Sequence, residues 1–237
     1  MATMSSIESN ANTTSVDTAD AALVTVGDGA TTQARKRPRA GERRVQILQA
    51  LASMLEQPGT DRVTTAALAA RLEVSEAALY RHFASKAQMF EGLIEFIEAS
   101  VFSLLNQIMA KADAASVAEP AVLDAGLRQA ARMVAVLLQF AEKNPGMTRV
   151  MVGDALVLEN ERLTQRMNLF FDKVEATLRQ CLREAHANTT SDTPTVDAQV
   201  QASVLVAFAL GRLQRFTRSG FKRLPTEQLE LSLAILL

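Results

Sequence analysis

Four side chains that can donate hydrogen bonds to anionic oxygens stand close together in the sequence: Tyr80, Arg81, His82 and Lys86. Tyr80 is the single tyrosine of the chain, and His82 is one of two histidines. Donors of these types bind the phosphate groups of nucleic acids. A run of small residues that includes Ala77 comes just before them. A helix with such a slim leading edge fits a DNA major groove, where an alanine methyl can touch the methyl group of thymine.

Two short helices around a tight turn are predicted to position these side chains. Thr64 or Thr65 can cap the first helix and Ser75 the second, because their hydroxyl oxygens accept hydrogen bonds from first-turn amides. Glu73 stands in the turn, where a left-handed glycine often closes a helix, and a non-glycine residue there costs about 1–2 kcal/mol. The sequence leaves open whether the turn has another geometry or tolerates this cost. The pattern is that of a helix-turn-helix.

The predicted DNA contacts fall into two groups. Ala77 and its neighbours are expected to touch base edges, while threonine, tyrosine, histidine and lysine side chains hold the sugar-phosphate backbone. The full predicted set is Arg62, Thr64, Thr65, Ser75, Glu76, Ala77, Tyr80, Arg81, His82 and Lys86. A basic arm that ends at Arg44 would add sequence-independent attraction, although such a run is equally typical of a solvated linker. Its predicted DNA-contacting residues are Arg35, Lys36, Arg37 and Arg39.

Lys86 is informative because of its position. Ser85 and Gln88 read as a capping box, with Ser85 as the cap and Gln88 reaching back, so Lys86 falls in the first turn of the next helix. A positive charge there opposes the helix dipole, at a cost of about a few tenths of a kcal/mol. A phosphate would reverse the sign, because the amides and the ammonium would then face the same anion. We expect a phosphate contact; the alternative is a tolerated surface lysine.

Charge and composition support a nucleic-acid module joined to a helical body. The net charge is −1, but residues 1–34 carry four acids and no Lys or Arg, whereas residues 35–90 carry ten Lys or Arg and five acids. One basic segment in an otherwise neutral or acidic chain is typical of a DNA-binding domain. Apolar residues make up 48% of the chain and aromatic residues only 5%, and no stretch alternates with period two. We therefore expect an all-α fold.

Helical periodicity continues through the rest of the chain. We expect an amphipathic helix at 42–56 and further helices at about 87–110, 122–143, 147–158, 161–185 and 197–218. The last of these is apolar on two faces and must be buried on both. We predict that it forms a four-helix bundle with helix 161–185 and their copies in a second subunit; an ordinary core helix is the alternative. The predicted interface residues are Phe170, Val174, Val204, Ala207 and Gly211.

The predicted organisation has three parts: a disordered tail with the basic arm at 1–40, a helix-turn-helix DNA-binding domain at 41–87, and a helical body at 88–237. The single cysteine, Cys181, rules out an intrachain disulfide and fits a reducing compartment. One cysteine and two histidines make no zinc set, and we expect no metal and no cofactor. No uncharged run approaches a membrane span, and the N-terminus does not read as a secretory signal, so we expect a cytoplasmic protein without a membrane partner.

The motif and its surroundings resemble the TetR family of DNA-binding regulators: an amphipathic helix, then TTAALAARLEVSEAALYRHFASK, then an all-helical dimerising body. Within that family the chain is similar to the nucleoid occlusion factors over about residues 42–225, through NPGMTRVMVGDAL, RMNLFFDKVEATLRQCLRE and RFTRSGFK. The resemblance implies a homodimer on palindromic sites of double-stranded chromosomal DNA, with room for more than one dimer per site, and association with the nucleoid. It also implies antagonism of the division protein FtsZ, so that its ring does not assemble over unsegregated DNA.

The FtsZ contact of the nucleoid occlusion factors lies in a groove of the body. The groove is lined by the helix after the DNA-binding module and by the helix that ends at Asn-Pro-Gly. The resemblance places the contact, with the acidic tail of FtsZ near Lys143, at Phe96, Val136, Gln139, Lys143 and Asn144.

Two other functions stay open at this point. The ordinary TetR role, a ligand-responsive repressor, needs a pocket in the body. Met133, Val136, Leu137 and Phe140 are candidates to line one, although such a stripe is more typical of a plain core. An enzyme is disfavoured, because no glycine-rich phosphate loop stands in a suitable context and no nucleophile–base pair is evident. A filled body would favour a protein partner, and an open cavity would favour an inducer.

Overall fold

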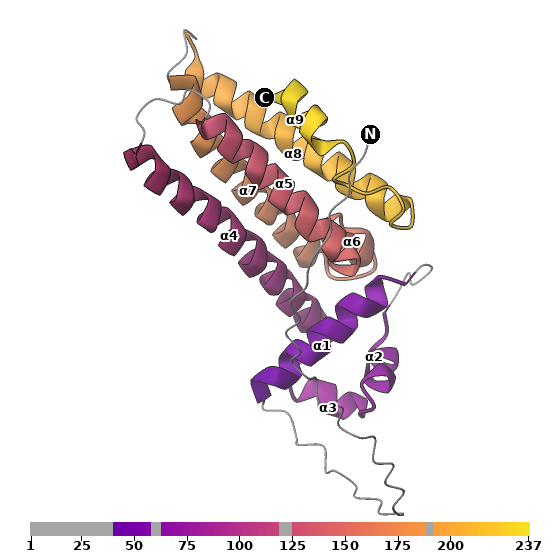
Figure 1. The fold of residues 1–237 in the computed structure, drawn as a ribbon. Helices are drawn as coiled ribbons and strands as arrows, with labels where there is room; N and C mark the ends of the chain where they lie inside the picture. The colour runs from indigo at the N-terminus through magenta and orange to yellow at the C-terminus, as the bar shows by residue number, and fades with distance from the viewer. Residues whose placement is uncertain (1–39, 58–62, 119–124, 188–191) are drawn as a thin grey trace, which may run out of the picture. The chain divides into compact units, whose positions relative to one another are not determined.

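The computed structural model describes residues 40–57, 63–118, 125–187 and 192–237, with the backbone alone for residue 40 and residues 111–118. Every regular element within these ranges is a helix, which confirms the predicted all-α class. The elements, labelled in Figure 1, are α1 (Ala40–Leu55), α2 (Thr65–Arg71), α3 (Glu76–Tyr80), α4 (Lys86–Ala118), α5 (Ala125–Lys143), α6 (Pro145–Met151), the 3-10 turn η1 (Asp154–Leu156), α7 (Glu161–Ala187), α8 (Pro194–Arg218) and α9 (Leu229–Leu236).

The helix-turn-helix module depends on α1 for its packing. Ile47, Leu51 and Leu55 project from α1 at helical spacing and are buried. Leu68 of α2 and Leu79 of α3 are buried in the same apolar cluster. α1 packs against both α2 and α4, and α2 packs against α3. Helices of five and seven residues have little stability of their own, so these tertiary contacts are what hold α2 and α3 in place.

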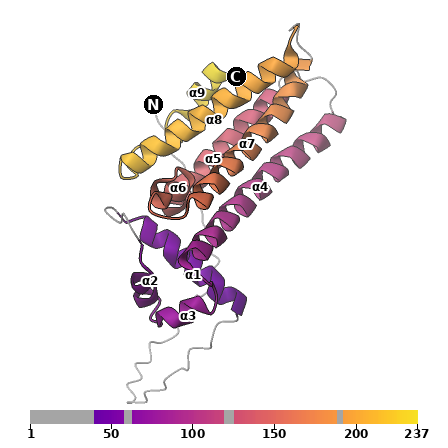
Figure 2. The same cartoon turned by 180° about the vertical axis from the view of Figure 1, so that it is seen from behind.

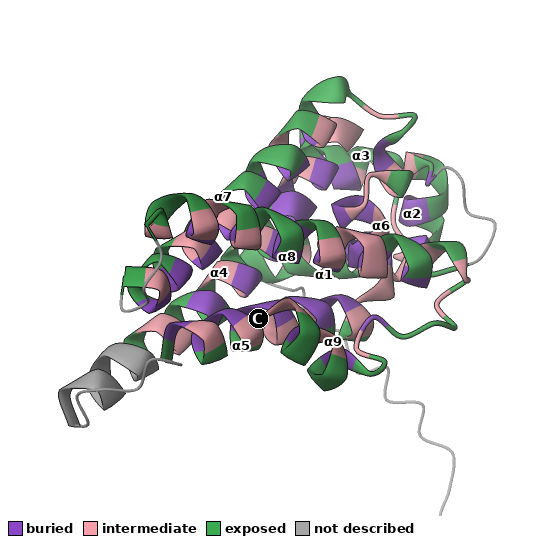
Figure 3. Ribbon diagram, turned by 90° about the horizontal axis from the view of Figure 1, so that it is seen from above, coloured by how far each residue is buried: buried purple, intermediate pink, exposed green. Residues whose placement is uncertain are grey.

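The body is a bundle of α4, α5, α7 and α8, which the two opposite views show side by side (Figures 1 and 2). α5 packs against α4, α7 and α8, and the most extensive helix–helix contact joins α7 to α8. Buried residues of these helices face the interior of the bundle, while exposed residues face outward (Figure 3). This separation is what amphipathic helices produce when they share one core.

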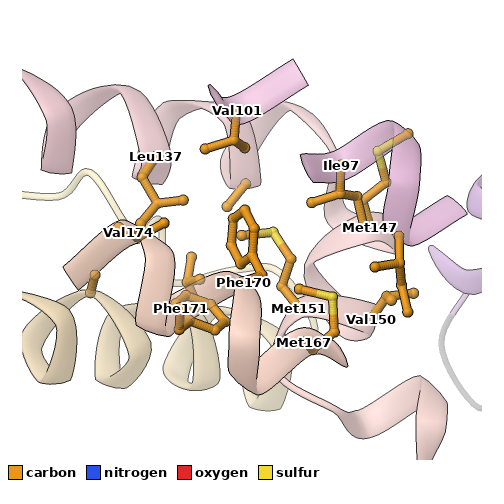
Figure 4. Close-up of a cluster of buried hydrophobic side chains, with 14 of the residues drawn as sticks. Ile97, Val101, Leu137, Met147, Val150, Met151, Met167, Phe170, Phe171 and Val174 are labelled. Carbon is orange, nitrogen blue, oxygen red and sulfur yellow. The ribbon is translucent and has the colours of Figure 1, made fainter. Parts of the chain in front are cut away.

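Phe170 of α7 lies in the middle of this core (Figure 4). Its ring packs edge-to-face against Phe102 and Phe171, at centroid distances of 5.6 and 5.0 Å. Val101 of α4 and Leu137 of α5 lie on the same cluster from the neighbouring helices. Burial of a phenylalanine ring contributes about 1.5–3 kcal/mol, and edge-to-face contacts add to this. The three helices therefore share one continuous apolar interior.

Arg166 of α7 adds a polar link to α4. Its guanidinium nitrogens lie 3.4 Å from a carboxylate oxygen of Glu95 and 2.9 Å from one of Glu98. Partial burial disfavours the charge on Arg166, but the hydrogen bonds and charges of the two glutamates outweigh this and raise its pKa. The guanidinium is therefore fully charged and ties α4 to α7 outside the apolar core.

Helix boundaries differ most clearly from the predicted ones at two places. α4 continues to Ala118, whereas the helix was expected to end near residue 110, because the added segment is rich in alanine, the strongest helix former. The helix expected at 147–158 is instead α6 and η1. Gly153 separates them in a left-handed conformation with φ of 85°, which glycine adopts without strain. The expected start of α5 at residue 122 and the tail at 1–39 lie outside the described residues.

Two described helices have the length and apolar content to cross a membrane, Lys86–Ala110 and Pro194–Arg218. The sequence alone did not suggest them, because charged residues interrupt both. In the fold, Leu93, Ile97 and Val101 of the first helix and Leu205 and Leu213 of the second are buried in the protein core. A core helix passes the same test of length and hydropathy, and burial in the core accounts for part of the apolar residues of both segments.

The DNA-binding module meets the body at Gly146, in the first turn of α6. A Cβ atom at this position would lie 1.9 Å from the backbone oxygen of Ala52 in α1. Only glycine permits this approach, so the Asn-Pro-Gly sequence does more than end α5. Arg149, one turn further along α6, donates to the backbone oxygen of Leu55 at 3.3 Å. α6 therefore holds the C-terminal half of α1 by a steric fit and a hydrogen bond.

Replacing Gly146 by alanine tests this contact. The added Cβ meets the backbone of α1, which cannot rotate away as a side chain can, so we expect a loss of at least about 2 kcal/mol in unfolding free energy. Urea unfolding followed by circular dichroism measures this loss. Gly41→Ala is the matched control, because a Cβ there meets nothing within 4 Å, and it should leave stability unchanged or slightly raised. Equal stabilities of the two variants would contradict the proposed close approach.

Candidate nucleic-acid interface

Both predicted helix caps are present in the helix-turn-helix. The Oγ1 atom of Thr64 accepts a hydrogen bond from the amide of Ala67 at 3.2 Å, at the start of α2. The Oγ atom of Ser75 accepts from the amide of Ala78 at 3.3 Å, at the start of α3. Each hydroxyl satisfies an amide that has no partner within its helix. Between the two predicted candidates for the first cap, Thr64 is the residue used.

The turn between α2 and α3 tolerates a left-handed glutamate. Glu73 has φ of 55°, so the turn has the geometry that usually takes glycine. Its amide donates to the oxygen of Ala70 at 3.1 Å, and the amide of Val74 donates to the oxygen of Ala69 at 3.0 Å. These two bonds form a Schellman motif, which satisfies carbonyls at the end of α2. The local backbone cost is therefore offset by the hydrogen bonds that the conformation makes possible.

Two polar contacts fix the orientation of α3. Thr65 donates from Oγ1 to a carboxylate oxygen of Glu76 at 2.5 Å, which joins the start of α2 to the start of α3. Arg44 donates to the backbone oxygen of His82 at 2.7 Å, and its guanidinium lies 4.2 Å from the ring centroid of Phe83. Arg44 therefore binds the backbone at the end of α3. The sequence had suggested instead that it is a free member of the basic arm. Phe83 itself is buried.

The predicted DNA-contacting residues lie on the exposed side of α2, α3 and the start of α4. Tyr80 is 44% exposed, which is unusual for an aromatic side chain and leaves its hydroxyl accessible. Thr64, Ser75, Glu76, Ala77 and Arg81 are also exposed, and Thr65, His82 and Lys86 are half-buried. Arg62 and the arm residues Arg35, Lys36, Arg37 and Arg39 lie outside the described residues. The exposed set combines small residues with hydrogen-bond donors, which is the chemistry that a DNA duplex requires.

Lys86 is the first residue of α4, and Ser85 precedes it as predicted. Ser85 accepts from the amide of Gln88 at 3.1 Å. The side chain of Gln88 reaches back one residue further than expected, to the amide of Ala84 at 2.8 Å. The ammonium group of Lys86 is bonded to the carboxylate of Glu159, in the segment between η1 and α7. Glu159 thus supplies the anion that offsets a positive charge at a helix N-terminus.

Sequence reasoning missed Glu159 because nothing local marks it. The two partners are 73 residues apart, and Glu159 stands in a short polar stretch between helices. A contact over such a separation depends on the packing of α7 against α4 and α5, which periodicity does not specify.

The predicted partner site lies on two neighbouring helices. Phe96 of α4 is 44% exposed, and Leu104 on the same helix is 37% exposed. On α5, Gln139 and Lys143 are exposed and Val136 is half-buried. Asn144 follows α5, and its amide group donates to the backbone oxygen of Phe140 at 2.7 Å. α4 packs against α5, so this surface joins exposed apolar side chains to a lysine at a helix C-terminus.

The predicted dimer surface needs one correction. Phe170 and Val174 are 0% and 2% exposed inside the core of their own protomer, so they cannot reach a second subunit. The apolar stripe of α7 packs against α4, α5 and α8 of its own protomer. On α8, Val204 is 44% exposed and Ala207 is exposed. Gly211 is half-buried, but apart from its own helix backbone no atom lies within 4 Å of a Cβ built there, so no neighbouring element of the protomer approaches it closely.

A surface groove runs between α7 and α8 beside these residues. Its volume is about 470 Å³. It is lined by residues that include Asn168 and Asp172 of α7 and Ser203, Ala207 and Leu210 of α8. Most of the α7 residues that line this groove are polar, whereas most of those from α8 are apolar. The exposed side of α7 that lies beside α8 is therefore not indicated by the hydrophobic pattern of the sequence.

The residues considered for an inducer pocket are used in packing. Met133 and Leu137 are buried in the core. Val136 and Phe140 are half-buried, and Phe140 packs against the same core cluster. None of these four lines the grooves found on α4, α7 and α8 in the described part of the chain. Met133 and Leu137 therefore serve the core of the body rather than a groove at its surface.

Comparisons with known proteins agree with the geometry. Residues 47–93 match the family model described as bacterial regulatory proteins of the TetR family, and residues 125–237 match the SlmA-like model described as a tetracyclin repressor-like C-terminal domain. In fold, the chain is similar to the fatty acid degradation regulator FadR from Bacillus halodurans, with a TM-score of 0.64 and 13% identity over 85% of this chain and 96% of that one. FadR from Bacillus subtilis in complex with stearoyl-CoA gives a TM-score of 0.60 at 13% identity, covering 81% and 96%. These structures show the fold alone.

Similarity to curated proteins is much stronger. The nucleoid occlusion factor SlmA of Idiomarina loihiensis is 49% identical over 185 residues, which cover 78% of this chain and 88% of that protein. SlmA of Vibrio cholerae is 47% identical over 195 residues, which cover 82% and 93%. Identity at this level extends through the variable body as well as the helix-turn-helix. The chain therefore belongs to the SlmA family of nucleoid occlusion factors, DNA-binding regulators of the TetR type rather than enzymes.

Proposed function

We propose that this chain binds palindromic chromosomal sites as a homodimer and, when bound, antagonises assembly of the FtsZ ring over the nucleoid. The observation that carries the proposal is identity of 47–49% to SlmA proteins over about four-fifths of the chain, body included. A cytoplasmic location on the nucleoid follows from that role. The proposed domains are those given above, and α4 crosses the boundary between residues 87 and 88 as one continuous helix.

The DNA step uses the exposed side of the helix-turn-helix. α3 enters the major groove with Ala77 and its neighbours at the base edges, because side chains of this size let the helix approach closely. Tyr80, His82 and Thr64 hold phosphates on either side, and Lys86 joins them at the start of α4. Two copies related by a two-fold axis read two half-sites, which is why the site is palindromic.

Dimerisation uses the surface of α8 with the outward side of α7. Val200 and Val204 are 57% and 44% exposed, and Ala207 and Gly211 continue the same face. Exposed valines in a row on a long helix are costly in water and gain about 25 cal/mol for each Å² of apolar surface that a partner covers. The space over Gly211 then admits the backbone of the second subunit.

Antagonism of FtsZ uses the α4–α5 surface. Phe96 offers an apolar anchor, and Lys143 at the C-terminus of α5 offers a positive charge for an acidic peptide. Lys143 stands three residues before Gly146, where α1 of the DNA-binding module contacts the body. A shift of the module on DNA would therefore act on α6 and the end of α5, so DNA binding is coupled to this surface.

The phosphate contact of Lys86 has a specific signature. Lys86→Ala should weaken binding to all DNA sequences alike and lower the slope of log K against log salt by about one unit, because one fewer phosphate is neutralised. Fluorescence anisotropy with a palindromic duplex and a scrambled duplex, over a range of salt, measures both. Lys173→Ala, at an exposed lysine of α7, serves as the control and should change neither value. A change in base preference for the Lys86 variant would contradict this placement.

The dimer surface is tested by a charge on α8. Ala207→Glu should weaken the dimer at least about 100-fold, because it would bury a carboxylate without a partner. Sedimentation velocity over a range of concentrations measures this. Ile235→Glu on α9 places the same charge at a residue that is 85% exposed and should leave the dimer unchanged. A dimer unaffected by Ala207→Glu would exclude this face.

FtsZ assembly tests the division step. Light scattering of FtsZ polymers should fall when the protein is added with its palindromic DNA, and fall only weakly without DNA. Lys143→Glu should abolish the effect by repelling an acidic peptide, while DNA affinity stays within about 2-fold of the unchanged protein. Lys173→Glu is the matched charge reversal outside the α4–α5 surface and should retain full activity. Tight DNA binding with no effect on FtsZ would instead favour a ligand-controlled repressor.

A further inference from the structure

We propose that Glu159 is an internal competitor of the DNA backbone for Lys86, so that the protein without DNA holds this cation on its own body. The inference rests on the proposed DNA contact of Lys86. When DNA binds, a phosphate takes the place of the carboxylate, and the segment before α7 is released. The pair is then a gate that sets DNA affinity and reports DNA occupancy to the body.

The pair is built into a shielded position. The side chains of Lys86 and Glu159 are 22% and 11% exposed, so water screens their attraction less than at an open surface. The ammonium also lies 5.6 Å from the ring centroid of Phe90. A pair this shielded is held more firmly than an exposed one, whose net contribution is close to zero. Lys86 is therefore bound in the absence of DNA, and a phosphate has to displace its partner.

Helix termini explain why a carboxylate stands at this place. Lys86 begins α4, where its own charge opposes the helix dipole, and an anion beside it is stabilising. Glu159 stands two residues before α7 begins, next to Asn160, whose side-chain oxygen accepts from the amide of Arg162 at 3.0 Å. A negative charge just before a helix is favourable too. Glu159 thus stabilises the N-terminus of α4 as a bound phosphate would.

Binding of both Glu159 and a phosphate to Lys86 costs free energy. Both are anions, and in a partly desolvated site their repulsion is larger than in water. If the carboxylate stays, it repels the phosphate; if it leaves, the ion pair is lost. In either case, Glu159 makes the free energy of DNA binding less favourable. Removing its charge should therefore tighten binding.

Release of Glu159 also changes the body. The segment 153–160 carries Val157 and Leu158, which are 76% and 62% exposed, and it starts at the left-handed Gly153. Leu156 before them is buried in the core, so the ion pair at Glu159 acts as a restraint only on residues 157–160, after that anchor. When DNA binds, this restraint on the segment is lost. The resulting change in the body is separate from the contact at Gly146.

The experiment compares DNA affinities of charge-neutral variants by fluorescence anisotropy. Glu159→Gln should bind both palindromic and scrambled duplexes about 5- to 50-fold more tightly than the unchanged protein. Glu98→Gln is the matched control: it removes one charge from a partly buried ion pair with Arg166, away from Lys86, and should change affinity less than about 2-fold. Hydrogen exchange of residues 157–160 should rise on DNA binding in the unchanged protein and be high already, without DNA, in Glu159→Gln.

A double-mutant cycle separates the gate from simple charge removal. In a Lys86→Ala background the gain from Glu159→Gln should disappear, because the cation that both anions seek is gone. Unchanged or weaker DNA binding by Glu159→Gln, or a gain that persists without Lys86, would overturn the gate. Failure of the unchanged protein to bind DNA would overturn the proposed function itself, a different result. If Glu159→Gln unfolds, Glu159→Ser replaces it in the cycle, with the same expectations.

Discussion

The contact between the backbone of α1 and Gly146 is the constraint on which the arrangement of this protein depends. α2 and α3 are too short to be stable alone, and they take their place from α1. α1 in turn packs on α6, where the oxygen of Ala52 stands within reach of any Cβ at residue 146. The position of the recognition helix is therefore set by a residue of the body. A chain with a larger residue there would have to move the whole module.

Two of the interactions that join the module to the body are of different kinds. The approach at Gly146 is steric, is independent of salt, and has no competitor. The bond between Lys86 and Glu159 is electrostatic, and an anion from outside can replace it. A junction of this composition lets the module stay attached while one of its links is exchanged. Binding of a polyanion can then change the body without detaching the helix-turn-helix from it.

Local signals in the sequence predicted the local structure well. The caps at Thr64 and Ser75 and the helix start at Lys86 follow from hydrogen-bonding rules that act within a few residues, whereas the sequence left the geometry of the turn at Glu73 open. The pairing of Lys86 with Glu159 could not be predicted in this way, because it depends on how distant helices pack. The same holds for Gly146, which reads as a helix breaker until α1 is placed against it.

Hydrophobic periodicity succeeded and failed for one reason. It identifies the face of a helix that is buried, but it does not say against what. On α7 the stripe through Phe170 and Val174 is covered entirely by the protomer, so the prediction of an intersubunit contact there was wrong. On α8, apolar residues on two faces exceed what one core can cover, and Val200 and Val204 are left exposed. A helix with more apolar faces than the core of its own protomer can cover is therefore the better sequence signal for a subunit surface.

The surfaces proposed for a second subunit, a protein partner and DNA use different residues, although α4 carries both Lys86 and Phe96. Exposed apolar side chains occur on α4, at Phe96 and Leu104, and on α8, at Val200 and Val204. The residues proposed for DNA lie on α2, α3 and the first turn of α4. Because the residues proposed for the three roles do not overlap, we propose that a second subunit, a protein partner and DNA are bound at the same time. Regulation by DNA would then act through the contacts at Gly146 and Lys86.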